Sequence, residues 1–155
     1  MTFKYIVLFF VVITVIIVIG FIFVWRVTDK AHNVSNEWVT AIAKGDFETV
    51  LQKSTPALKK LVSVEKIQDF SKEAALVNAV PVSWMRREFF SKDKVIVLGG
   101  VCMTESKDSI TVVMTLKELD GEWYVDSVRV GSDMSGKLRR GADLHIGETG
   151  LFFSR

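Results

Sequence analysis

The sequence has little of two residue types that often build metal sites or crosslinks: it holds one cysteine and two histidines in 155 residues. Cys102, the single cysteine, lies in an apolar strand-like run, which excludes an internal disulfide framework and predicts a small core hydrophobe. His32 and His145 are far apart and have no second histidine or cysteine at ligand spacing. We therefore predict no metal site and no cofactor.

A charge imbalance is also absent from most of the chain. The formal net charge of +2 comes from Lys4 and Arg26, since removing them from the 20 basic residues leaves 18, equal to the 18 acidic residues. A nucleic-acid partner usually requires a concentrated basic face. The balanced composition predicts that this protein does not bind nucleic acid.

Charge is missing altogether between Tyr5 and Trp25, a run of 21 residues dominated by Val, Ile and Phe. As a helix, such a run crosses about 30 Å of hydrocarbon. Tyr5 and Trp25 suit the headgroup region at its two ends, and Lys4 and Arg26 extend their charges outward into water. The pattern predicts a transmembrane anchor at residues 1–26, in contact with a lipid bilayer, with these four residues at the interfaces.

A cleavable signal peptide is the competing interpretation of this run. Its apolar region would be about 7–15 residues and would precede a small-x-small cleavage site, whereas this run continues into Trp25-Arg-Val-Thr-Asp-Lys30. We therefore favour an uncleaved signal anchor. The basic residues on its two sides nearly match, but the short head before Lys4 is typical of an anchor that translocates everything after it. We expect a single-pass protein of the inner or plasma membrane, with its domain on the extracytoplasmic, periplasmic side.

Residues 27–131 change from a helical to a strand pattern at Pro81. Before it, apolar spacing predicts a helix to about Lys44, ended by Gly45, and then short helices that begin at Asp46, Thr55 and Ser63. After it, alternation predicts strands at Val82–Phe90, Lys94–Thr104, Ser109–Leu119 and Glu122–Val130.

The dipeptide Asp120-Gly121 between two of these strands is a hairpin signal, and Gly99-Gly100 inside another indicates a bulge or bend. The fold class predicted is α+β, with helices packed on a curved four-stranded antiparallel sheet. Residues 132–155, rich in glycine and basic residues, are predicted to be a flexible tail.

Three segments resemble parts of the NTF2-like (cystatin-like, SnoaL-like) domain and occur in the same order. They are the opening helix and turn at Trp38–Phe47, a second helical segment at Ser54–Lys60, and a closing hairpin at Leu119–Val125. The resemblance covers roughly Ala31–Val130 and implies a cone of helices on a bent sheet. With its predicted anchor, the chain is also distantly similar to VirB8-like periplasmic domains, which have one N-terminal membrane span.

The resemblance implies where chemistry would lie, because enzymes of this superfamily use a carboxylate base and an acidic or phenolic partner inside the cone. Alternate positions of the central strands hold no such groups. Tyr124 and Asp126 share one predicted strand face, and Arg86 or Arg87 near Trp84 could hold an anionic ligand or a lipid headgroup. We therefore predict no enzymatic activity and name Trp84, Arg86, Tyr124 and Asp126 as possible pocket or partner contacts.

The function predicted from these observations is a membrane-anchored accessory or scaffold domain. It would bind a protein partner of a membrane or envelope complex, or a second copy of itself. The alternative is a small-molecule or lipid-binding module, or a weak isomerase or hydrolase, that uses the apolar cone as a pocket. An open cavity with Asp126 or Arg86 pointing into it would favour the alternative, and a cavity filled by Trp and Met side chains would favour the scaffold.

Overall fold

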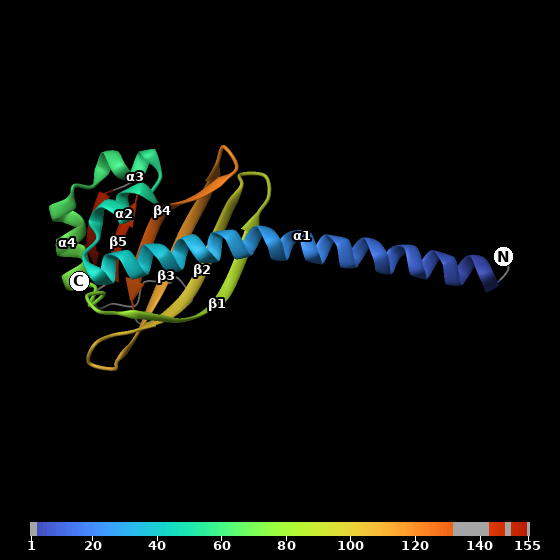
Figure 1. The fold of residues 1–155 in the computed structure, drawn as a ribbon, viewed down its shortest axis with the longest axis horizontal. Coiled ribbons are helices and arrows are strands. Elements are labelled where there is room, and N and C mark those ends of the chain that lie inside the picture. The colour runs from blue at the N-terminus through green and yellow to red at the C-terminus, as the bar shows by residue number, and fades with distance from the viewer. Residues whose placement is uncertain (1–2, 132–142, 148–149, 155) are drawn as a thin grey trace.

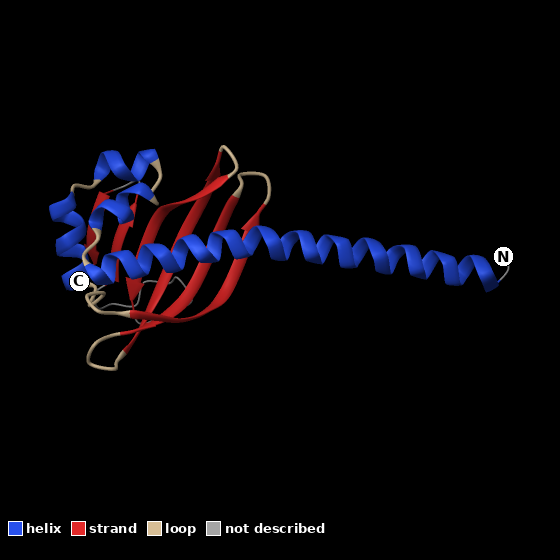
Figure 2. Ribbon diagram, in the orientation of Figure 1, coloured by secondary structure: helices blue, strands red, loops and turns tan. Residues whose placement is uncertain are grey.

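The computed structural model describes residues 3–131, 143–147 and 150–154, with the side chains of residues 5, 7–22, 26, 28–81 and 83–131. One long helix and three short helices precede a six-stranded antiparallel sheet, and the helices cover one face of it (Figures 1 and 2). This confirms the predicted α+β class. The helices are α1 (Phe3–Lys44), α2 (Phe47–Gln52), α3 (Pro56–Leu61) and α4 (Val64–Glu73), and the strands are β1 (Val80–Phe90), β2 (Val95–Met103), β3 (Ser109–Leu119), β4 (Glu122–Gly131), β5 (Asp143–Gly147) and β6 (Gly150–Ser154).

The helix boundaries follow the predicted signals. Gly45 adopts a φ of 75°, a left-handed conformation that glycine reaches without strain, and α1 ends just before it. The side chains of Asp46, Thr55 and Ser63 each accept a hydrogen bond from a backbone N–H three residues later. These are N-caps, which replace the helical partner that the first turn lacks. All three predicted helix starts are confirmed.

The six strands form a meander in the order β1-β2-β3-β4-β5-β6, with every neighbouring pair antiparallel. The predicted hairpin turn is present: Asp120 and Gly121 both have positive φ, at 53° and 86°, as its two central residues require. The first four strands lie within two residues of the predicted bounds.

Two further strands, β5 and β6, lie in the segment 132–155 that the sequence predicted to be a flexible tail. β5 pairs with β4 at three positions, and β6 pairs with β5. Each strand has only five residues, so its alternation is too short to stand out in a glycine-rich segment. The four-stranded sheet of the prediction is therefore the first part of a six-stranded one.

The core lies between the inner part of α1, the short helices and one face of the sheet. Trp38, Phe70 and Met114 are among its largest fully buried side chains. Cys102 is buried among them, as predicted, and burial raises the pKa of its thiol to about 11. The buried apolar side chains of the central strands lie at alternate positions, and they are Ile96, Leu98 and Cys102 from β2, and Val112, Met114 and Leu116 from β3.

Strand β1 is irregular where it faces Gly99 and Gly100. Its pairing with β2 shifts register twice, between Pro81 and Ser83 and again between Trp84 and Arg86. A Cβ on Gly100 would lie 2.5 Å from the Ser83 carbonyl oxygen and 2.6 Å from the Trp84 ring. The two glycines therefore mark a bulged region, as predicted, but the shifts are in the strand opposite them.

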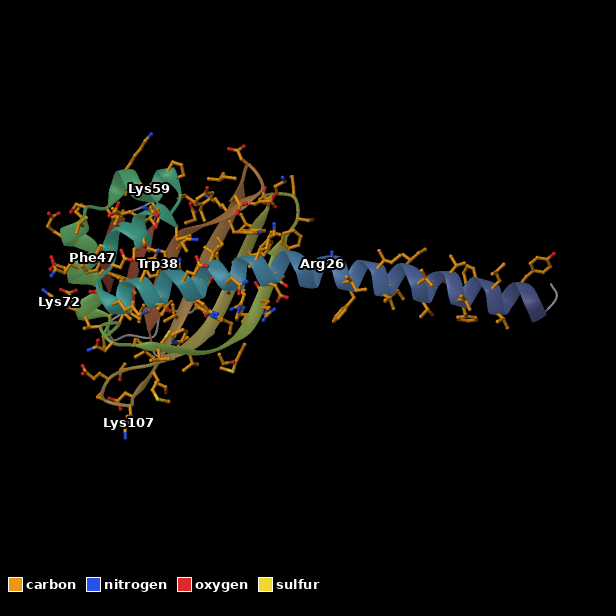
Figure 3. The ribbon with its side chains drawn as sticks, viewed as in Figure 1. Arg26, Trp38, Phe47, Lys59, Lys72 and Lys107 are labelled. Carbon is orange, nitrogen blue, oxygen red and sulfur yellow. The ribbon has the colours of Figure 1, made fainter. Side chains whose placement is uncertain are left out.

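Helix α1 has 42 residues and two different surroundings. Its second half packs on β1, β2 and β4, whereas its first half projects away from the domain with side chains on every side (Figures 1 and 3). Among the residues that the structure describes, no helix is both long enough and apolar enough to qualify as a membrane span. Of the four predicted interface residues, Tyr5 and Arg26 are exposed, and the side chains of Lys4 and Trp25 lie outside the described residues.

Candidate functional site

The four candidate contact residues lie in three separate places. Trp84 faces the helices from β1, Arg86 lies on the opposite face of the sheet, and Tyr124 and Asp126 lie in β4 close to the start of α3. The fold does not bring them together into one pocket. Each place has its own geometry and a different consequence for function.

Trp84 links β1 to the inner half of α1. Its side chain is 9 % exposed, and its Nε1–H donates a hydrogen bond of 2.7 Å to Asn36 Oδ1. The His32 ring meets the indole edge-on, with 6.3 Å between the ring centroids. These contacts use both the apolar ring and its polar N–H, which is how a buried tryptophan is usually satisfied. Trp84 therefore holds the helix against the sheet.

Arg87 joins the same contact region, while its neighbour Arg86 does not. The Arg87 guanidinium lies 3.6 Å from an Asp29 carboxylate oxygen on α1. Burial, and then the positive charge of Arg87, lower the pKa of His32, and Asp29 partly opposes them. The two adjacent arginines therefore lie on opposite faces of the sheet, as neighbouring residues of a strand do.

Asp126 is an extra residue in a β-bulge. Thr115 pairs with Ser127 and Leu116 with Val125, so Asp126 has no partner in β3. Its side chain is nevertheless buried, with 9 % of its surface exposed. The bulge breaks the alternation on which the predicted common face with Tyr124 depended.

Two polar groups hold the Asp126 carboxylate. Oδ1 accepts a hydrogen bond of 3.0 Å from the Thr55 hydroxyl, and Oδ2 lies 2.8 Å from Lys117 Nζ. Next to it, the Thr55 N–H donates to the Val125 carbonyl at 2.8 Å, so the start of α3 is bonded to β4 through backbone and side chain. Asp126 therefore holds the start of α3 against the sheet.

Tyr124 lies beside this junction, half-buried, with Lys59 Nζ 6.0 Å from its ring centroid. That distance is at the outer limit of a cation–π contact. Two further tryptophans pack in the core: Trp38 is buried and its Nε1–H donates to Ser54 Oγ at 3.2 Å, and Trp123 is buried and meets Phe89 edge-on.

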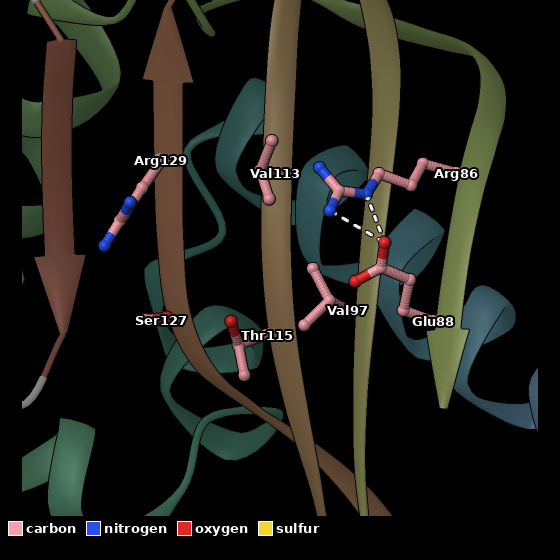
Figure 4. Close-up of a pocket in the computed structure, with 7 residues that line it drawn as sticks. All are labelled: Arg86, Glu88, Val97, Val113, Thr115, Ser127 and Arg129. Atoms are coloured by element: carbon pink, nitrogen blue, oxygen red, sulfur yellow. Dashed lines mark hydrogen bonds and ion pairs between the residues drawn. The ribbon is translucent and has the colours of Figure 1, made fainter. Parts of the chain in front are cut away.

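Arg86 lines a depression of about 270 Å³ on the sheet face that the helices leave open (Figure 4). We call it the outer-face depression. Its side chains come from four strands, β1 to β4, and they are Arg86, Glu88, Val97, Val113, Thr115, Ser127 and Arg129.

Arg86 is held in a fixed position within the outer-face depression. Its Nε and Nη2 lie 2.9 and 2.7 Å from Glu88 Oε1. A Cβ on Gly99 would lie 3.2 Å from the Arg86 Cβ and 3.7 Å from its Cδ. The absence of a side chain at Gly99 therefore leaves the room in which Arg86 lies across β2, toward Val113 (Figure 4).

Sequence reasoning found Arg86 but missed Glu88, Thr115, Ser127 and Arg129. The available signal was the period-two pattern of polar residues on β1 and β4, where Arg86 and Glu88 share one face, as do Ser127 and Arg129. That pattern alone does not place the strands beside one another. The register between β1 and β4, through two intervening strands, brings these side chains together.

The depression presents two guanidinium groups, one carboxylate and two hydroxyls around two valines. Such donors suit hydrogen bonding to an anion. Within the described part of the chain, no cluster of three or more His, Cys, Asp or Glu side chains could hold a metal ion.

Comparison of the chain with models of known families, with curated proteins and with solved structures finds no match in any of the three.

Proposed function

We propose that this protein is a single-pass membrane protein whose tethered α+β domain has an accessory or scaffold role and binds a partner in a membrane or envelope complex. The observation that carries the proposal is the continuity of α1. One helix runs without a break from an exposed apolar stretch into the core of the domain. The domain is therefore fixed to whatever covers that stretch.

The exposed stretch is apolar on all sides. Every large apolar side chain described between Tyr5 and Ile22 has at least 36 % of its surface exposed. A helix that is hydrophobic all round is a buried helix, in a large core or in a membrane. The 21 uncharged residues of the sequence match the thickness of a bilayer. Lipid is the surrounding that this composition fits best.

The interior between the helices and the sheet is filled, which favours a scaffold role and not a binding pocket inside the cone. Trp38, Phe70 and Met114 occupy the space between the helices and the sheet, each with 1 % exposure or less. Asp126 is the one charged side chain among the buried residues that the structure describes, and Thr55 and Lys117 hold it. We propose that the domain has the NTF2-like fold, because that fold also has its helices first in the chain and a curled antiparallel meander after them.

The side of the membrane belongs to the same proposal. In it, the domain lies outside the cytoplasm, on the inner or plasma membrane. Protease added to intact cells or spheroplasts should cleave the domain. Cleavage only after membrane lysis would place the domain on the cytoplasmic side and overturn this part.

Membrane fractionation followed by crosslinking tests the central proposal. The full chain should stay with membranes in alkaline carbonate and be released by detergent. A photoreactive amino acid at Val113, in the outer-face depression, should then crosslink one membrane protein, or a second copy, in stoichiometric yield in intact membranes. The same probe at exposed Val64, on α4, is the matched control and should not. A chain that stays soluble and monodisperse without detergent would contradict the anchor, and absence of a specific product from Val113 would contradict the partner role.

The depression also favours a second candidate, because Arg86 points into it. A small anionic molecule could bind there, on the open face of the sheet and outside the core. Crosslinking at Val113 separates the two candidates, because a small ligand leaves no protein adduct.

A further inference from the structure

We propose that the outer-face depression binds one carboxylate carried by the partner protein, supplied by an acidic side chain or by a chain terminus. The inference rests on the proposed function and deepens it by naming the chemistry of the contact. Charge, donor geometry and size each support a carboxylate.

Among the side chains of the depression that the structure describes, the charges leave room for one negative charge. Arg86 and Arg129 contribute two positive charges, and Glu88 contributes one negative charge. A single carboxylate balances the remainder. A doubly charged phosphate would exceed it, and the Glu88 carboxylate would repel it more strongly than it repels a singly charged carboxylate.

One of the two guanidinium groups is arranged before a ligand arrives. Glu88 fixes the guanidinium of Arg86, and Gly99 lets its stem lie flat on the sheet. Arg129 extends from β4 with an exposed side chain, and its guanidinium points away from Arg86 (Figure 4), so it turns toward the depression when it shares the ligand. Planar guanidinium groups match the two oxygens of a carboxylate, and the guanidinium of Arg86, which is already ordered, loses less entropy on binding.

The remaining lining suits the stem of an acidic side chain. Val97 and Val113 are half-buried and provide apolar surface, and Thr115 and Ser127 add hydroxyls beside them. The volume of about 270 Å³ is just below the range of about 300–1,000 Å³ typical of small-molecule sites. One side chain of a docked protein fits this space better than a whole cofactor does.

NMR titration of the full chain in detergent micelles tests the proposal, with methyl groups of Val97, Val113 and Thr115 as reporters. The probes are N-acetyl-glutamate N-methylamide, its glutamine analogue, N-acetylglycine and inorganic phosphate. We expect the glutamate probe to bind at least tenfold more tightly than the glutamine analogue, and phosphate to bind more weakly than the carboxylates. Tighter binding of N-acetylglycine than of the glutamate probe would identify a chain terminus as the source, and the reverse an acidic side chain.

The variant Arg129→Gln should weaken the carboxylate probes at least fivefold, because it removes one of the two guanidiniums. Lys72→Gln, an equal loss of charge on exposed α4, is the matched control and should leave binding unchanged. Equal binding of the glutamate and glutamine probes, an unchanged affinity in Arg129→Gln, or tighter binding of phosphate would overturn the inference.

The crosslinking experiment separates this inference from the proposed function. If Val113 crosslinks a protein partner and Arg129→Gln leaves the yield unchanged, the partner role stands and the carboxylate contact is wrong. If the glutamate probe binds but no protein crosslinks, the depression is a site for small acids and the partner role is wrong.

Discussion

The two halves of α1 have the same secondary structure and opposite surroundings. Between Tyr5 and Ile22 the apolar side chains that the structure describes point to every side and are exposed, whereas between Thr28 and Ala43 buried and exposed residues alternate with a helical period. The inner half buries Trp38 and Ile42 against the domain. An apolar stripe on one side is typical of a helix that packs on protein. An apolar surface on all sides is typical of a helix that is buried in a large core or in a membrane.

This difference teaches that one helix can belong to two environments without a hinge. The hydrogen-bonded ladder continues through Arg26, where the exposed charge follows the apolar run. The inner half derives its stability from packing, and the outer half derives it from lipid in our proposal. The domain should therefore tolerate changes in the outer half, and the outer half should tolerate unfolding of the domain.

Three arginines in the outer half should have the largest effect. In the variant Val12→Arg/Ile16→Arg/Ile19→Arg, each arginine costs about 3 kcal/mol at the centre of a bilayer, and each apolar residue contributes only about 0.3–0.6 kcal/mol to insertion. The combined cost of about 9 kcal/mol is comparable with the favourable total of the run. We expect the chain to leave the membrane pellet in alkaline carbonate.

The control carries leucine at the same three positions and should stay in the membrane. Urea unfolding of the domain, measured in detergent, should be the same in both variants. Retention of the arginine variant in the pellet would show that lipid does not surround this half.

Removing Trp38 should have the next largest effect, and only on the domain. Trp38→Ala leaves a cavity between the helices and the sheet and should lower the free energy of unfolding by about 3–5 kcal/mol. Phe9→Ala is the matched aromatic truncation in the outer half, where the ring is exposed. It should change the urea midpoint of the domain by less than a tenth of the Trp38→Ala shift. Similar shifts in the two variants would break the comparison between the halves.

A smaller effect tests how the inner half is attached to β1. Gly100→Ala places a methyl group against the Ser83 carbonyl and the Trp84 ring, and overpacking of this kind costs about 1–3 kcal/mol. Gly99→Ala meets the Arg86 Cβ at 3.2 Å, a milder contact on the other face, so it should cost less. Urea unfolding followed by tryptophan fluorescence measures both. Equal losses would mean that Trp84 does not depend on the close approach at Gly100.

The smallest expected effect is a pH dependence at the junction of α1 and β1. The pKa of His32 is lowered in the folded state, so the unfolded chain takes up this proton at a higher pH. The contribution of neutral His32 to the free energy of unfolding is therefore present above its ordinary pKa of 6.5. It is lost as the pH falls from 6.5 through the lowered pKa of the folded state. Urea midpoints at about pH 7.5 and about pH 5.5 should differ less in His32→Gln than in the wild type. An identical pH dependence in the two proteins would show that His32 does not contribute to the pH dependence of stability.

Local signals in the sequence predicted much of the fold. Capping by Asp46 and Thr55, the stop at Gly45 and the turn at Asp120-Gly121 each depend on a few neighbouring residues. Their physical causes are backbone conformation and unpaired N–H groups, which are local. Alternation then identified the four main strands and the α+β class.

The candidate site depended on features that are not local. The bulge at Asp126 and the shifts around Trp84 reverse the faces expected from simple alternation. Arg86 and Arg129 meet the same depression because strand register places them there, across more than 40 positions of the chain. A sequence pattern can place polar residues on one face of a strand, but it cannot say which strands lie beside one another.

The most direct test is a spin-label scan along the outer half of α1 in lipid nanodiscs. Single cysteines at positions 7–22 are labelled, and native Cys102 can remain because it is buried and the pKa of its thiol is raised to about 11. Our account predicts greater accessibility to oxygen than to a water-soluble nickel chelate at every position, with no helical period. Greater accessibility to the nickel chelate throughout, or a 3.6-residue period with protected positions on one side, would contradict a helix that lipid surrounds.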